Sequence, residues 1–210
     1  MVRAKKPIDY INELCHSRRE EQRALGKTLN AQYERWIKTL TLKDFLEFNE
    51  TIMANKAEIG VAQFFGKFRA YALEEYIFRL IKEKIIIKKP FEVFWGEKCL
   101  VWQSGEKSYA IEFDISIGQK ICELIDPLVV FDAKVELDSA RLKTALASFA
   151  MLKRWKPTAR CVLVYITREL DDCLLELAKN WIDGVFQFSR ENDETAIFLN
   201  HVTKCLSMNR

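Results

Sequence analysis

The hydrophobic positions of this chain follow a helical period in its N-terminal part and a strand period after it. Over residues 8–57 apolar side chains recur at three- and four-residue intervals, which predicts two or three helices with a break near Gly26 and a capped start at Thr41. A longer helix is predicted from Ala62 to Lys84. We therefore expect a helical lobe at residues 1–60.

Beyond Pro90 the pattern changes to short aromatic and β-branched runs separated by turn residues. Three such runs, 91–95, 99–103 and 108–115, are expected to form an antiparallel meander. The run 128–135 is apolar almost throughout, which predicts a central strand. The remaining predicted elements are a helix from the capping pair Asp138-Ser139 to Pro157, a strand over 160–167, a helix over 171–182, a strand over 184–188 and a helix over 194–206.

This order of elements predicts the fold class. Two strands of one sheet that are joined by a helix usually run parallel, whereas a meander is antiparallel. The expected fold is therefore α/β, with a mixed sheet flanked by helices in residues 61–210 and the helical lobe in front of it.

Composition places the chain among ordinary folded proteins. Its 210 residues are 49% apolar and 30% charged, which suits one well-buried core. Six cysteines include no C-x-x-C pair, so free thiols in a reducing compartment are expected. Because the N-terminus lacks a signal-like apolar segment and no long apolar run is present, we expect a cytoplasmic protein with no membrane partner.

The charge is unevenly distributed along the chain. Residues 1–40 carry nine Lys and Arg against five Asp and Glu, so this part has a charge of +4 and the remainder −1. Such a basic lobe could contact phosphates or form a dimer surface, or it could be a solvated helix face.

Two carboxylates and a lysine follow apolar strand-like runs. Asp114 closes the run that begins near residue 108, and Asp132 and Lys134 close the next. Carboxylates at neighbouring strand ends can share a divalent cation, and a lysine two residues further on points to the same face of its strand. Asp126 competes for the role of first carboxylate, but it precedes Asp132 by only six residues and leaves no room for a separate strand and turn.

With these residues the sequence resembles the PD-(D/E)xK nuclease superfamily, which includes type II restriction endonucleases. The resemblance covers about residues 64–166 and rests on Asp114-Ile115, on Asp132-Ala133-Lys134 and on the surrounding element order. Phe113 stands where the family often has proline, and Asp132 where it often has glutamate. The resemblance implies a restriction-endonuclease-like core in which Asp114, Asp132 and the backbone carbonyl of Ala133 hold Mg²⁺, while Lys134 orients the attacking water or offsets developing charge.

Members of this superfamily often carry a further glutamate on the first core helix. Glu74 and Glu75 both qualify, and helical phasing favours Glu74, because it flanks the apolar stripe while Glu75 points away from it. The alternative for Glu74 is an ion pair with Arg69 or Arg79. Glu112 and Glu136 are weaker candidates for the same role, the first because it could be solvated and the second because of its place at the rim.

Three other groups of residues have features that could serve a function. His16 and His201 have no accompanying ligand pattern and are expected at the surface. The aromatic and basic segment 64–71 could stack on bases, but its spacing favours core packing. Residues 153–156 could contact phosphates, although positive charge is also favourable at a helix C-terminus.

The combined expectation is a Mg²⁺-dependent DNA endonuclease, with a type II restriction endonuclease as the favoured case. One such site cuts one strand, so a homodimer acting on double-stranded DNA is expected. The alternatives are a structure-selective or repair nuclease of the same fold, and a nucleic-acid-binding module without cleavage.

Overall fold

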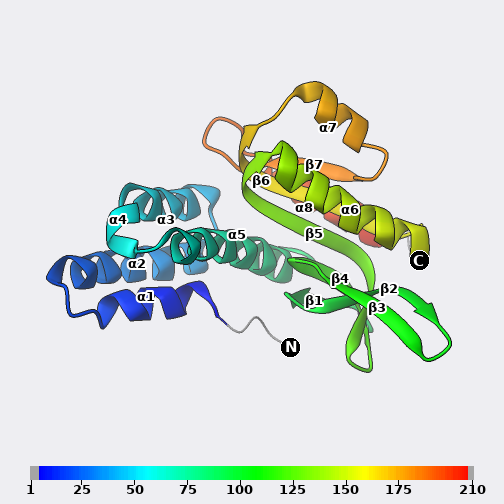
Figure 1. Ribbon diagram of the computed structural model, residues 1–210, viewed down its shortest axis with the longest axis horizontal. Helices are drawn as coiled ribbons and strands as arrows, with labels where there is room; N and C mark the ends of the chain where they lie inside the picture. Colours follow the sequence, from blue (N-terminus) through cyan, green and yellow to red (C-terminus); the bar gives the residue numbers. More distant parts are fainter. Residues whose placement is uncertain (1–4, 208–210) are drawn as a thin grey trace.

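A computed structural model describes residues 5–207 as a helical lobe followed by a mixed sheet with helices on both faces (Figure 1). The helices are α1 Pro7–Cys15, α2 Glu20–Thr39, α3 Leu42–Ala54, α4 Lys56–Ile59, α5 Ala62–Lys84, α6 Ser139–Trp155, α7 Asp172–Ala178 and α8 Thr195–Ser207. The strands are β1 Glu92–Trp95, β2 Lys98–Ser104, β3 Lys107–Glu112, β4 Ile115–Ile121, β5 Leu124–Asp138, β6 Arg160–Glu169 and β7 Gly184–Gln187.

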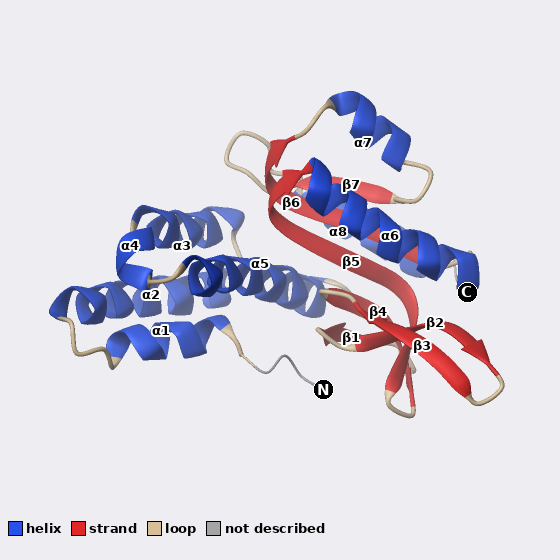
Figure 2. Cartoon of the chain, in the orientation of Figure 1, coloured by secondary structure: helices blue, strands red, loops and turns tan. Residues whose placement is uncertain are grey.

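The long strand β5 is the centre of the sheet (Figure 2). One of its edges pairs with β4, and the other pairs with β2 near its start and with β6 further on. The pairs β5–β6 and β6–β7 are parallel and are joined through α6 and α7, as predicted, whereas β1–β4, β4–β5 and β2–β3 are antiparallel. The mixed sheet is therefore confirmed.

The predicted meander is wrong in its pairing. The strand β1 pairs with β4 and not with β2, and the run expected over 108–115 is two strands with Phe113 and Asp114 between them. The strand β4 was not predicted as a strand because only its first half, which includes Ile115 and Ile117, is buried. Its polar second half belongs to a hairpin with β5 whose tip is exposed to solvent.

Two hydrophobic clusters cover the two faces of the sheet. On one face α5, α8 and the lobe pack together, and the cluster continues from Tyr10 in α1 through Trp36 in α2 to Phe131 in β5. On the other face α6 packs over β2, β5 and β6 through side chains such as Phe149. Gly60, where we placed the end of the lobe, lies between α4 and α5, and the first cluster includes residues from both sides of it. No helix within residues 5–207 is long and apolar enough to cross a membrane.

The expected helix break near Gly26 is also wrong. Gly26 is buried in the interior of α2, and the interruption lies between α1 and α2. A Cβ atom at this position would be 2.6 Å from the backbone nitrogen of Cys15. The glycine therefore permits close packing of α1 on α2, and this packing outweighs the low helix propensity of glycine. The predicted cap at Thr41 is confirmed, because its side chain accepts a hydrogen bond from the Asp44 backbone nitrogen.

Candidate active site

The candidate site lies where β5 extends beyond its neighbour β4. Phe131 is the last residue of β5 that pairs with β4, opposite Ile115, whereas pairing with β6 continues to Asp138. Asp114 immediately precedes β4, and its Oδ2 accepts a hydrogen bond of 2.8 Å from the backbone nitrogen of Ala133. The N–H and C=O of one residue in an extended strand point to the same side, so the carbonyl of Ala133 also faces this edge.

Asp132 and Lys134 do not close their strand, contrary to our prediction. They lie in the interior of β5, which runs on to Asp138. Their side chains share one face because they are two residues apart. The opening in the sheet is thus made by the start of β4 and not by the end of β5.

Lys134 lies between the two carboxylates. Its Nζ contacts Oδ1 of Asp132 and is 3.6 Å from Oδ2 of Asp114. Burial raises the pKa of Asp132 to about 6, with a further contribution from the negative charge of Asp114. Burial by itself would lower the pKa of Lys134, but the charges of Asp114 and Asp132 outweigh burial and raise it. The lysine is therefore a cation held between two acidic groups.

The donor groups at this edge suit a magnesium ion. Oδ1 of Asp132 is buried and accepts no hydrogen bond of regular geometry, although the Lys134 ammonium touches it. Within residues 5–207 no three His, Cys, Asp or Glu side chains are grouped so that they could hold a metal. Mg²⁺ usually takes only one or two carboxylates and completes its octahedron with water and substrate phosphate. Asp114, Asp132 and the Ala133 carbonyl would supply that number of protein ligands.

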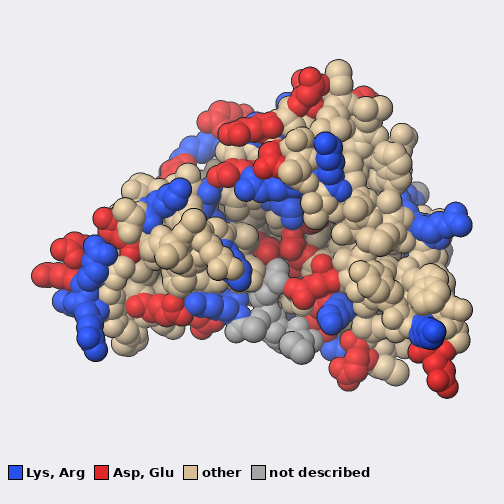
Figure 3. All heavy atoms as spheres, in the orientation of Figure 1, with Lys and Arg blue, Asp and Glu red and all other residues tan. Residues whose placement is uncertain are grey.

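Glu74 of α5 lines a cleft together with Asp114, Ala133 and Lys134. Its Oε2 accepts a 2.8 Å hydrogen bond from Nε1 of Trp95 in β1, and both side chains are buried. The cleft, called the carboxylate cleft below, has a volume of about 480 Å³. It is lined by Met53, Lys56, Ala62, Phe65, Gly66, Arg69, Ala70, Glu74, Asp114, Ala133, Lys134, Val135, Glu136 and Arg141. Figure 3 shows acidic and basic side chains gathered at the hollow between the helical lobe and the sheet.

Glu75 does not point away from the core as expected. It is 1% exposed, accepts hydrogen bonds of 2.9 and 3.1 Å from the hydroxyl of Tyr33 in α2, and forms an ion pair with Arg79. The helix α5 is covered on both sides, by the lobe and by the sheet, so its two neighbouring glutamates are both buried and face different partners. The ion pairs suggested for Glu74 are not formed, because Arg79 pairs with Glu75 and Arg69 with Glu136.

Exchanging each glutamate for glutamine should separate these environments. We expect Glu74→Gln to reduce metal-dependent activity by about 10- to 100-fold with little change in melting temperature. Glu75→Gln should mainly lower stability, by about 1.5–3 kcal/mol, because the buried hydrogen bonds from Tyr33 and Arg79 lose their charged acceptor. Initial rates as a function of Mg²⁺ concentration, together with thermal melting, check both outcomes. Equal loss of activity in two equally stable variants would contradict the assignment of Glu74.

The competing carboxylate Asp126 lies elsewhere on β5. We expected it in a connection between strands, but it pairs with Gln119 of β4 and accepts a 2.5 Å hydrogen bond from Nζ of Lys156. Lys156 belongs to the basic segment 153–156, in which Lys153 also forms an ion pair, of 2.8 Å, with Asp183. These two lysines therefore neutralise carboxylates of the sheet region.

Of the other residues named from the sequence, the two histidines and Glu112 do not line the carboxylate cleft, whereas part of segment 64–71 does. His16 is exposed, as expected, whereas His201 is half-buried with its ring 5.3 Å from that of Phe186. In the segment 64–71, Phe65 and Phe68 are buried, which confirms core packing. Glu112 is exposed at the end of β3.

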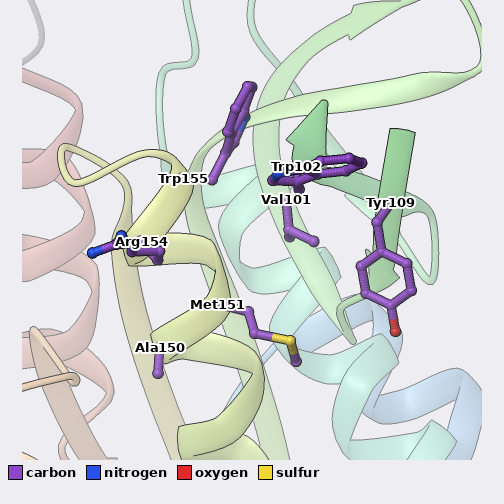
Figure 4. Close-up of a pocket in the computed structure, with 7 residues that line it drawn as sticks. All are labelled: Val101, Trp102, Tyr109, Ala150, Met151, Arg154 and Trp155. Atoms are coloured by element: carbon purple, nitrogen blue, oxygen red, sulfur yellow. The ribbon is translucent and has the colours of Figure 1, made fainter. Parts of the chain in front are cut away.

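A second hollow, of about 510 Å³, lies between the β2–β3 hairpin and α6 (Figure 4). It is lined by Val101, Trp102, Tyr109, Ala150, Met151, Arg154 and Trp155. Met151 points toward Tyr109, while Arg154 extends to the other side of the helix. None of these seven lining residues is a carboxylate, a histidine or a cysteine, so the hollow lacks the side chains that most often bind metal ions in proteins.

Comparison with known proteins shows a similarity in fold to a solved structure. No protein-family profile and no curated protein matches the chain. Among solved structures, the chain is similar to a chain of the native BbvCI tetramer of composition A2B2, with a TM-score of 0.56 and 13% sequence identity. The similarity covers 97% of this chain and 94% of that chain. The fold is therefore the predicted one, a restriction-endonuclease-like mixed sheet flanked by helices.

Proposed function

We propose that this protein is a Mg²⁺-dependent DNA endonuclease of the type II restriction class. The observation that carries the proposal is the meeting of Asp114, Asp132 and Lys134 at the open edge of β5, beside a cleft that Asp114, Lys134 and Glu74 line. The similarity in fold to BbvCI, a type II restriction endonuclease, supports it independently of these side chains.

The residues of this site would have separate roles in phosphodiester hydrolysis. When bound, Mg²⁺ supplies charge neutralisation at the scissile phosphate and lowers the pKa of a coordinated water. Asp114 and Asp132 would hold the ion, and the Ala133 amide already donates a hydrogen bond to one oxygen of Asp114. Lys134, which the two carboxylates keep protonated, donates a hydrogen bond to the attacking water or to the non-bridging phosphate oxygens.

We further propose that the enzyme acts as a homodimer on double-stranded DNA. A single carboxylate cleft contains one set of reacting groups and would cut one strand, so a double-strand break needs two copies. BbvCI is a tetramer with two copies of each of two subunits, which supports assembly of more than one chain but not a homodimer in particular. The basic residues of the lobe could contact DNA or the second copy, and Arg18 and Arg19 are exposed there. Arg23 instead donates to the carbonyls of Ser17 and Arg18 and stabilises the α1–α2 connection.

Digestion of unmethylated phage DNA tests the proposal. With Mg²⁺ we expect discrete fragments, and with EDTA none. A smear of fragments would show that the protein is a nonspecific or repair nuclease and not a restriction endonuclease. Unchanged DNA, combined with retained DNA binding, would favour a binding module without cleavage and would overturn the enzymatic proposal. Analytical ultracentrifugation of the protein with a DNA duplex measures the number of copies in the complex.

A further inference from the structure

Three charged side chains line the carboxylate cleft beyond the proposed metal site. Arg69 comes from α5, Glu136 from β5 and Arg141 from the first turn of α6. Glu136 is two residues beyond Lys134 on the same strand, which places it about 7 Å further along the cleft. This step is comparable to the distance between neighbouring phosphates of one nucleic-acid strand.

Glu136 joins the two arginines in the free protein. Nη1 of Arg69 donates a hydrogen bond of 2.8 Å to its Oε1. Nη1 of Arg141 donates a hydrogen bond of 3.1 Å to the backbone carbonyl of Glu136 and is 3.6 Å from Oε2 of Glu136. The hydrogen bond from Arg69 holds the pKa of Glu136 below its usual range. Arg141 also pairs with Asp138 at 3.0 Å.

Arg69 and its partner Glu136 differ in burial, and this difference determines which of the two can move when DNA binds. Arg69 is 8% exposed, and a guanidinium at that depth requires an anionic partner. The side chain of Glu136 is 41% exposed and can rotate into solvent when another anion arrives. A phosphodiester carries one negative charge and offers oxygens in the geometry that a guanidinium binds in a bidentate manner.

We propose that Arg69 and Arg141 form a subsite for a DNA phosphate next to the scissile one, and that Glu136 occupies this subsite until DNA binds. The proposal rests on the proposed function, since it assumes that DNA lies in the carboxylate cleft. The alternative is that the Arg69–Glu136 ion pair only holds α5 against β5. The two accounts predict opposite effects of Glu136 on DNA affinity. A fastening carboxylate would support DNA binding indirectly, whereas a competing carboxylate opposes it.

Binding of a DNA duplex to variants in a Lys134→Ala background, which is not expected to cut, distinguishes the two accounts. Arg69→Gln and Arg141→Gln should each weaken binding by about tenfold and reduce the slope of log affinity against log salt by about 0.9. Glu136→Gln should strengthen binding by about threefold or more. Arg168→Gln is the matched control, because Arg168 also forms a local ion pair, with Asp172 at 2.8 Å, but does not line the cleft.

Melting temperatures identify any variant that is unfolded. If Arg69→Gln does not fold, the DNA affinities of Arg141→Gln and Glu136→Gln still test the proposal. Weaker binding by Glu136→Gln, or arginine variants that bind like Arg168→Gln, would overturn the subsite while DNA cleavage by the wild type still supports the proposed function. If the wild type neither cuts nor binds DNA, both proposals fail together.

Discussion

Replacing Lys134 by alanine should reduce Mg²⁺-dependent DNA cleavage by about 100-fold or more while DNA affinity changes little. The reason is that the ammonium group contacts Asp132 and is 3.6 Å from Asp114, beside the proposed metal site, and the loss of one positioned charge at such a place costs this much in rate. Rates under single-turnover conditions and filter binding of the same duplex measure the two quantities separately.

The same variant has a consequence for stability. Without Lys134 the two acidic groups lose a cation, and the buried Oδ1 of Asp132 loses its contact. We expect a lower melting temperature in EDTA and a larger stabilisation by Mg²⁺ than in the wild type. Lys156→Ala is the control, because it also removes a lysine from an aspartate of β5 but at Asp126. Cleavage by Lys134→Ala at the rate of that control would remove Lys134 from the active site.

Asp114→Asn and Asp132→Asn should each abolish Mg²⁺-dependent cleavage, whereas Asp126→Asn should leave it intact. Each of the first two substitutions removes one of two carboxylates that would hold the ion, and an amide oxygen is a weaker ligand for a hard cation. Asp126 is bound to Lys156 at the other end of β5. Cleavage assays over a range of Mg²⁺ and Mn²⁺ concentrations, with calorimetric titration of the metal, give the comparison.

Asp114→Asn also tests the local geometry. The amide oxygen can still accept the hydrogen bond from the Ala133 nitrogen, so the fold should be retained while the charge is lost. An inactive Asp126→Asn beside an active Asp114→Asn would reverse the choice of first carboxylate. Unchanged metal affinity in both Asp114→Asn and Asp132→Asn would place the ion elsewhere.

Local patterns in the sequence predicted much of the fold. The helix from Ala62 to Lys84, the cap at Thr41 and the cap at Asp138 were predicted correctly, because each depends on residues within a few positions of one another. The parallel pairing of β5 and β6 followed from the connection between them. By contrast, β4 was not predicted, since its polar half gives no strand period.

The candidate site was predicted in composition but not in geometry. Asp132 and Lys134 share a strand face by simple alternation, which the sequence shows directly. That Asp114 reaches the Ala133 amide depends on where the pairing of β4 with β5 begins, at Ile115, which is a long-range property. The burial of Glu75 was also unpredictable from helix phase, because a single stripe cannot show that α5 is covered from two sides.

The adjacent positions of Glu74 and Glu75 limit how freely the lobe can be exchanged between related proteins. Glu74 is hydrogen-bonded to the sheet through Trp95, and the next residue is bonded to Tyr33 of the lobe. A transplanted or redesigned lobe that shifts Tyr33 would also shift the backbone that carries Glu74. A chimera divided at Gly60 would take Tyr33 from one parent and Glu75 from the other, so it would keep this hydrogen bond only if both parents have the pair.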